Sequence, residues 1–188
     1  MTYKIADEEA FKHVADSYRW LAAAGCTHGS TELQRAKTHL TNVDVAIQAS
    51  ALVHARMLIE FWAKGWKGRS QKKDRKTDIG AMSHFGVEID EKDPDLIYLA
   101  TDRSGIKDSI DKHLSHITEY RDVKNPKRSK HERVDWDSDI PQIIEALVNL
   151  LRNAMSQQQV RCRPQFVKLL AAVEGRLVDQ HYAWPTHF

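Results

Sequence analysis

Apolar residues recur at spacings of three and four along most of this 188-residue chain, and no segment shows the strict alternation typical of a half-buried strand. Such spacing places apolar side chains on one face of a helix. The first predicted helix covers residues 7–24, with Asp7 placed to cap its start and Gly25 to end it. Its apolar positions are Phe11, Val14, Ala15, Tyr18 and Leu21. The pattern predicts an all-α protein.

Further helical patterns follow along the chain. The longest runs over residues 33–62, with a capping signal at Thr31 and Gln34 and an expected break near residues 41–42. Residues 78–104 are less readable, with a short helix expected around 78–86 and helix-start chemistry at Pro94. A helix over about 104–121 comes next.

Two more helices complete the predicted set. One starts at Asp139 and Pro141, and another is broken or opened by Pro164. The expected inward positions are Ile143, Ile144, Leu147, Leu150 and Leu151 in the first, and Phe166, Val167, Leu170, Val173 and Leu177 in the second. We therefore predict one domain, residues 1–188, built as a single bundle of four to six helices with short capping helices and basic loops.

Composition excludes several classes of protein. The hydrophobic content is 41% and the charged content 29%, which indicates a folded globular chain. Cys26 and Cys162 are the only cysteines, too few for a disulfide framework or a CxxC pair, which fits a reducing compartment. The longest apolar stretch, "ASALVHARMLIEFWA", is interrupted by His54, Arg56 and Glu60 and favours a core helix over a membrane span. We expect a cytoplasmic protein with no membrane contact and no cofactor.

One polar constellation stands out in "SIDKHLSHITEYRD", residues 109–122. On a helix of this sequence, His113 falls in the apolar stripe, Arg121 lies two turns further on, and His116 lies at the stripe's edge. His54 likewise lies in the middle of an apolar stripe, so we expect it to be buried. Polar side chains in a core are costly unless they meet each other or a ligand. The sequence therefore predicts a shared site of His54, His113, His116 and Arg121.

Structural roles for the same residues stay open. Each histidine can be a core residue hydrogen-bonded to a carbonyl or hydroxyl, and Arg121 can cap carbonyls at a helix end. Arg56 and Glu60 form a separate i, i+4 pair on another face of the longest helix, where we expect a second helix to cover them.

The polar site fits two chemistries. A histidine as general acid or base beside Arg121, which would hold the phosphate, suits metal-independent cleavage of RNA. Alternatively His113 and His116, at i, i+3, with His54 and a carboxylate such as Asp78 or Glu60, suit a metal ion.

Basic segments add an RNA-binding hypothesis, although the net charge of +2 is too small to indicate nucleic-acid binding by itself. Trp62 and Trp66 lie near one of these segments and could stack a base. Solvated loops are the alternative. The C-terminal "DQHYAWPTHF" is rich in aromatic residues, which favours docking onto the bundle or onto a second subunit. The predicted nucleic-acid contacts are Lys67, Arg69, Lys72, Lys73, Arg75, Lys127 and Arg128.

These features resemble the HEPN superfamily of small bacterial and archaeal helical proteins, many of them RNases of toxin, antiphage or RNA-processing systems. The family motif is an Arg followed by a polar residue and, after a short spacer, a His. "RLVDQH" has this spacing but places Leu177 at the polar position, and "RDVKNPKRSKH" begins with Arg121 but places His131 further away. "LVHARMLIEFW" and "IDKHLSHITEYR" also look like a group of uncharacterised bacterial helical proteins.

The resemblance implies a helical bundle, a homodimer, an RNA partner and a protein partner such as an antitoxin. Our leading hypothesis is an RNA-binding or metal-independent RNA-cleaving protein of a bacterial toxin or defence type. The first alternative is a non-catalytic dimeric helical interaction module, and the second is a metal-binding bundle using His54, His113 and His116.

Overall fold

The computed structural model describes residues 7–28, 41–66, 79–101, 105–115 and 136–178. Within these ranges it contains seven helices and no strand, so the all-α prediction is confirmed. The helices are α1 (Asp7–His28), α3 (Thr41–Ala63), α4 (Ala81–Phe85), α5 (Pro94–Ala100), α6 (Ile106–Ser115), α7 (Trp136–Ser156) and α8 (Arg163–Val178).

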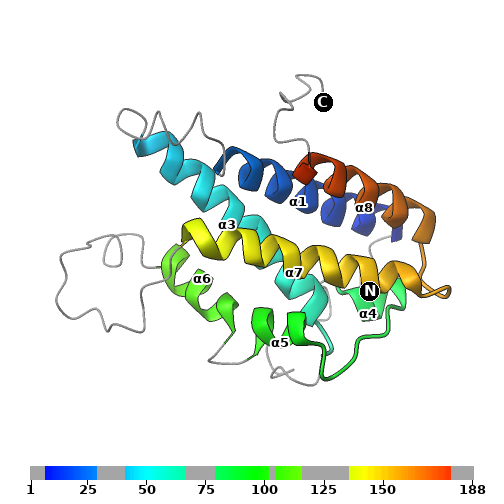
Figure 1. Cartoon of the computed structure of the whole chain (residues 1–188). Helices are drawn as coiled ribbons and strands as arrows, with labels where there is room; N and C mark the ends of the chain where they lie inside the picture. The colour runs from blue at the N-terminus through cyan, green and yellow to red at the C-terminus, as the bar shows by residue number, and fades with distance from the viewer. Residues whose placement is uncertain (1–6, 29–40, 67–78, 102–104, 116–135, 179–188) are drawn as a thin grey trace, which may run out of the picture.

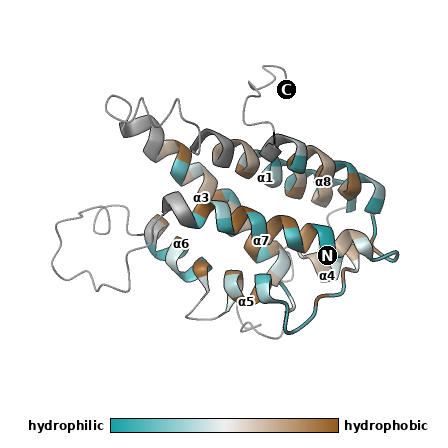
Figure 2. Ribbon diagram, viewed as in Figure 1, coloured by the Kyte–Doolittle hydropathy of each residue, from teal (hydrophilic) through white to brown (hydrophobic). Residues whose placement is uncertain are grey.

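The helices pack around a crossing of α3 and α7 (Figure 1). On one side α1 and α8 lie next to each other, and both start at the same end, where Arg161 just before α8 lies 3.4 Å from Asp7 of α1. The shorter helices α5 and α6 lie on the other side, against α7 and α3. Figure 2 shows apolar residues along the crossing helices, which therefore form the centre of the core.

Aromatic rings hold the end of the core where α1 and α8 start. Phe166 of α8 makes edge contacts with Phe11 at a centroid distance of 4.9 Å and with Phe85 at 5.0 Å. Phe85, on the five-residue helix α4, is fully buried and also contacts Phe61 of α3. Such edge-to-face pairs are the preferred geometry of packed aromatic rings. The short helix α4 therefore closes the bundle by inserting one ring, as expected of a capping helix.

One buried hydroxyl joins three helices. Tyr18 Oη of α1 accepts a hydrogen bond from Trp62 Nε1 of α3 at 2.7 Å and donates one to the Leu147 carbonyl of α7 at 2.8 Å. Burial raises the pKa of the Tyr18 phenol, so the hydroxyl keeps its proton. This arrangement satisfies three polar groups in the core and fixes α1, α3 and α7 relative to one another.

The connection from α4 to α5 is held by a side chain of the segment that follows α7. Gln157 Oε1 accepts a hydrogen bond from the Glu88 backbone N–H at 2.8 Å, and Gln157 Nε2 donates one to the Glu88 carbonyl at 2.7 Å. At the end of this connection, Asp93 caps α5 by accepting from the backbone N–H of Asp95 and Leu96. Pro94 occupies the first helical position, so the helix-start chemistry predicted there is confirmed.

Two predicted helix boundaries are wrong. The helix α1 continues through Gly25 to His28, and α7 starts at Trp136 and contains Pro141 instead of starting near it. Glycine inside a helix costs about 1 kcal/mol and proline about 3 kcal/mol, which are local preferences that tertiary contacts can outweigh. In α7 the predicted core positions are all buried, so packing of the helix offsets the cost of the proline.

The predicted inward face of α8 needs one correction. Phe166 and Val173 are buried as expected, but Val167 is exposed and Leu169 is buried in its place. The buried residues follow an i, i+3, i+7 pattern, which leaves Val167 about 100° away from the core side of the helix.

Candidate functional site

The helix α3 is apolar nearly all round, but the other described helices cover only some of its sides. Its covered sides face α1 and α7 and hold the buried residues Ala51, Leu52, Ala55, Leu58, Ile59 and Trp62. The side opposite these buried residues holds Ala46, Val53 and Met57, and the last two are 43% and 48% exposed. We call these three residues the α3 face. A helix that is apolar all round is normally buried all round, so the α3 face is an unusual feature.

An aromatic pair borders the α3 face on the side of α1. The Trp20 ring, 43% exposed, lies parallel to the His54 ring at a centroid distance of 6.0 Å. His54 Nδ1 is buried and has no hydrogen-bond partner among the described residues. Burial lowers the pKa of His54, against a smaller opposing effect of the Asp16 carboxylate. At neutral pH His54 is therefore an uncharged, stacked ring.

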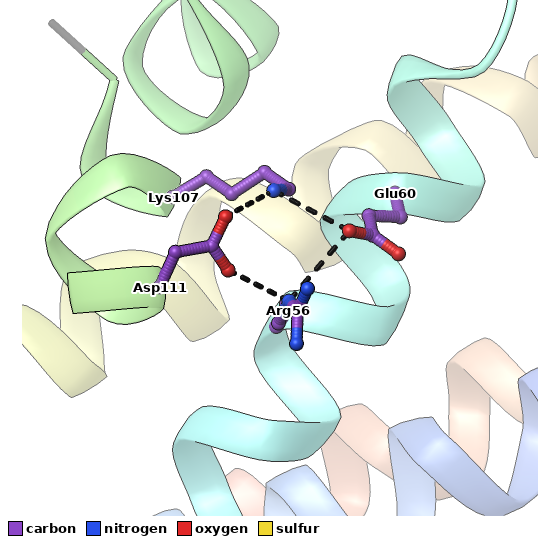
Figure 3. Close-up of polar contacts among 4 residues, drawn as sticks. All are labelled: Arg56, Glu60, Lys107 and Asp111. Atoms are coloured by element: carbon purple, nitrogen blue, oxygen red, sulfur yellow. Dashed lines mark hydrogen bonds and ion pairs between the residues drawn. The ribbon is translucent and has the colours of Figure 1, made fainter. Parts of the chain in front are cut away.

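A four-charge network borders the α3 face on the side of α6 (Figure 3). The Arg56 Nε atom lies 2.7 Å from Asp111 Oδ1 and 3.6 Å from Glu60 Oε1. The Lys107 Nζ atom lies 2.5 Å from Asp111 Oδ2 and 3.3 Å from Glu60 Oε1. Two cations and two carboxylates balance, and the network joins α3 to α6. The expected Arg56 and Glu60 pair is present and α6 packs beside it, but the two side chains remain 45% and 42% exposed, so the helix does not cover the pair as expected.

Of the four predicted catalytic residues, only His54 has a described side chain. It is half-buried at the edge of the α3 face, so the expectation that it lies inside the core is wrong. The reason is that α1 covers only one side of it, through Trp20. His113 belongs to α6 but its side chain is outside the described part, and His116 and Arg121 lie outside the described residues. Their convergence with His54 stays a prediction.

The predicted nucleic-acid and metal sites are largely outside the described residues. This holds for Lys67, Arg69, Lys72, Lys73, Arg75, Lys127 and Arg128. Within the described ranges, no three His, Cys, Asp or Glu side chains come together in a way that could hold a metal ion. Because Asp78, His116 and the His113 side chain are outside these ranges, the three-histidine metal site also stays a prediction.

A second polar cluster, at the end of the bundle where α1 and α8 start, was not singled out from the sequence. His84 Nδ1 accepts a hydrogen bond from the Gly80 backbone N–H at 3.1 Å and lies 3.0 Å from Ser83 Oγ. Burial lowers the pKa of His84, and the nearby cations Lys64 and Arg161 lower it further, while Asp7 opposes them. The Gly80 bond places the imidazole over the start of α4. In this position the His84 side chain caps the start of α4.

Two features of the candidate site were missed for different reasons. Trp20 is a large aromatic residue outside the apolar stripe predicted for residues 7–24. Its position in the sequence could therefore have indicated an exposed contact residue. Lys107 and Asp111 were not singled out from the sequence, but they point at α3, and Lys107 is only 15% exposed. Their i, i+4 spacing matches that of Arg56 and Glu60, but only the packing of α6 on α3 brings the two pairs together.

Comparison of the chain with protein-family models, curated proteins and solved structures found no match. The resemblance to HEPN proteins therefore stays a prediction. Among the described helices, none combines the length and the hydropathy needed for a membrane span.

Proposed function

We propose that this protein is a non-catalytic helical interaction module that forms a homodimer through the α3 face. The observation that carries the proposal is the exposure of Val53 and Met57 on a helix that is apolar nearly all round. An exposed tryptophan, Trp20, lies beside them. Tryptophan and methionine are enriched in the cores of protein interfaces, and a cluster of exposed apolar side chains on a folded protein is typical of a contact surface.

The charges around the α3 face favour a second copy of the chain as the occupant. Arg56 and Lys107 are balanced by Glu60 and Asp111, so this border has no net charge that would select an acidic or a basic partner. An isologous interface places the same surface on both sides of a two-fold axis, so the two identical surfaces must not repel each other through an excess of one charge. A balanced border meets this requirement.

The surroundings of His54 support a contact surface more than a phosphate site. A general acid or base for RNA cleavage works beside a cation that stabilises the developing negative charge. In the described part of the chain the ring partner of His54 is Trp20, and the charge that acts on it is the Asp16 carboxylate. The RNA hypothesis consequently rests on sequence patterns outside the described residues, and the contact surface rests on residues inside them.

The test is the oligomeric state measured by sedimentation equilibrium. We expect the wild-type chain to be a dimer at micromolar concentration, and Val53→Asp and Met57→Asp to shift it to monomer while the far-UV circular dichroism spectrum is unchanged. Val167→Asp is the matched control, because Val167 is equally exposed but lies on α8. A monomeric wild type, or a dimer that tolerates both substitutions on α3, would overturn the proposal.

A further inference from the structure

We infer that two copies of α3 pair antiparallel across a two-fold axis beside Met57, with Arg56 of each chain paired to Glu60 of the other. The inference rests on the proposed function and adds the direction of the pairing and the residues that determine its specificity. It concerns the part of the four-charge network that remains open to solvent.

The relevant side chains lie in two adjacent rows on α3. Val53 and Met57 are one turn apart, and so are Arg56 and Glu60, so each pair forms an i, i+4 ridge on the helix surface. Ridges of this kind are what two helices pack into each other's grooves. The apolar ridge supplies the buried contact, and the charged ridge runs alongside it.

The order of the two charges distinguishes antiparallel from parallel pairing. In a parallel pair, Arg56 would meet Arg56 of the second copy and Glu60 would meet Glu60. In an antiparallel pair the order is reversed in the second copy, so each Arg56 lies beside a Glu60. Like charges placed opposite each other across an interface repel and weaken binding, whereas alternating signs are complementary. Two copies of α3 with this charge order are therefore complementary when the helices pair antiparallel.

Both residues keep donors and acceptors for a second partner. The contacts of Arg56 within the network use Nε, and a guanidinium also carries N–H groups on Nη1 and Nη2. The contacts of Glu60 within the network use Oε1, and Figure 3 shows its other carboxylate oxygen pointing away from the network. Their side chains are 45% and 42% exposed. The outward halves of both groups are thus available across the axis.

The other two members of the network act within the chain. Lys107 is 15% exposed and lies between Glu60 and Asp111, and Asp111 contacts Arg56 from α6. Their contacts hold Arg56 and Glu60 in fixed positions on α3, which lowers the entropy lost when a partner binds. Lys107 and Asp111 are positioning residues for the interface.

A charge-swap experiment tests the pairing. Arg56→Glu makes the charged ridge wholly acidic, and Glu60→Arg makes it wholly basic. By sedimentation equilibrium, we expect each single variant to dimerise about tenfold or more weakly than the wild type, and an equimolar mixture of the two to recover wild-type affinity as a heterodimer. The double variant Arg56→Glu/Glu60→Arg restores alternating signs in reversed order and is expected to form a homodimer.

Two controls separate the pairing from folding and from dimerisation itself. Lys107→Gln loosens the positions of Arg56 and Glu60 and should weaken the dimer less than either charge reversal. Arg152→Glu reverses an exposed charge on α7, where Arg152 pairs with Glu174, and should leave dimerisation unchanged. If Val53→Asp abolishes the dimer but mixing the charge variants recovers nothing, the antiparallel pairing is wrong and the proposed function stands. If the wild type is monomeric, both fail.

Discussion

The hydroxyl of Tyr18 lies 2.7 Å from the indole nitrogen of Trp62 and 2.8 Å from the Leu147 carbonyl, all within the core. Tyr18→Phe would leave the Trp62 N–H and the Leu147 carbonyl without this partner. We expect a loss of about 1–3 kcal/mol in the free energy of unfolding, measured by urea denaturation. Tyr98→Phe is the matched control, because the buried Tyr98 hydroxyl has no hydrogen-bond partner among the described residues. That control should be neutral or stabilising, and equal losses in both variants would contradict the prediction.

Two glycines are expected to respond to alanine in opposite directions. Gly175 lies on the exposed side of α8, and a Cβ there would meet nothing within 4 Å. Gly175→Ala should stabilise the protein by up to about 1 kcal/mol, because alanine is the better helix former. A Cβ at Gly105 would lie 2.7 Å from the Thr101 backbone nitrogen, so Gly105→Ala should destabilise it. Thermal melting of both variants checks the signs.

Removal of Lys107 should weaken the contact between α3 and α6. Lys107→Gln leaves Asp111 and Glu60 with only Arg56 as a counter-ion inside the network. We expect a loss of about 1 kcal/mol in the free energy of unfolding, because much of the network is open to solvent. The loss should shrink at high salt. Lys112→Gln, an exposed position on the same helix, is the control and should change stability by less.

Stability should fall as the pH drops below about 6.5. Burial lowers the pKa of both His54 and His84 from 6.5 in the folded protein, so below that pH the unfolded chain binds more protons than the folded one. The stabilising contribution is complete above about pH 7 and is lost towards acid. His54→Gln and His84→Gln should each flatten the dependence of unfolding free energy on pH between about 5 and 7. A His13→Gln control, at an exposed position on α1, that flattened it equally would rule out this assignment.

Purified protein should leave RNA intact. The proposed module has no catalytic role, so we expect no cleavage in buffer with EDTA or with added Mg²⁺, and no difference between the wild type and His54→Ala. Cleavage that survives chelation and disappears in His54→Ala, His113→Ala and Arg121→Ala, all checked for folding, would support the RNase hypothesis and contradict the proposed function.

The periodicity of the sequence predicted the fold class and most of the core because both depend on one-dimensional patterns. Ile143, Leu147 and Leu151 are buried where the pattern placed them. The boundaries at Gly25 and Pro141 were wrong because local preference and tertiary packing compete there, and only the packing energy decides.

The candidate site was harder to predict because it depends on which helix faces remain uncovered. Because α3 is apolar nearly all round, its sequence pattern does not indicate which side of the helix faces the core. The sequence therefore could not show that Val53 and Met57 are exposed while Leu52 is buried. Likewise, the contact of Lys107 with Glu60 joins residues far apart in the chain. The pair of Arg56 and Glu60 could be predicted, because it lies within one helix.

The hydrogen bonds between Gln157 and Glu88 mean that a side-chain amide takes the place of a neighbouring strand. Both backbone polar groups of one residue, Glu88, are satisfied as they would be on a sheet edge, within described residues that are otherwise helix and loop. The long connection between α4 and α5 is thereby divided into two shorter ones, each with a smaller entropy of closure. Shortening Gln157 would therefore release the Glu88 backbone and loosen this connection, while α5 itself stays held by its buried Leu96 and Leu99.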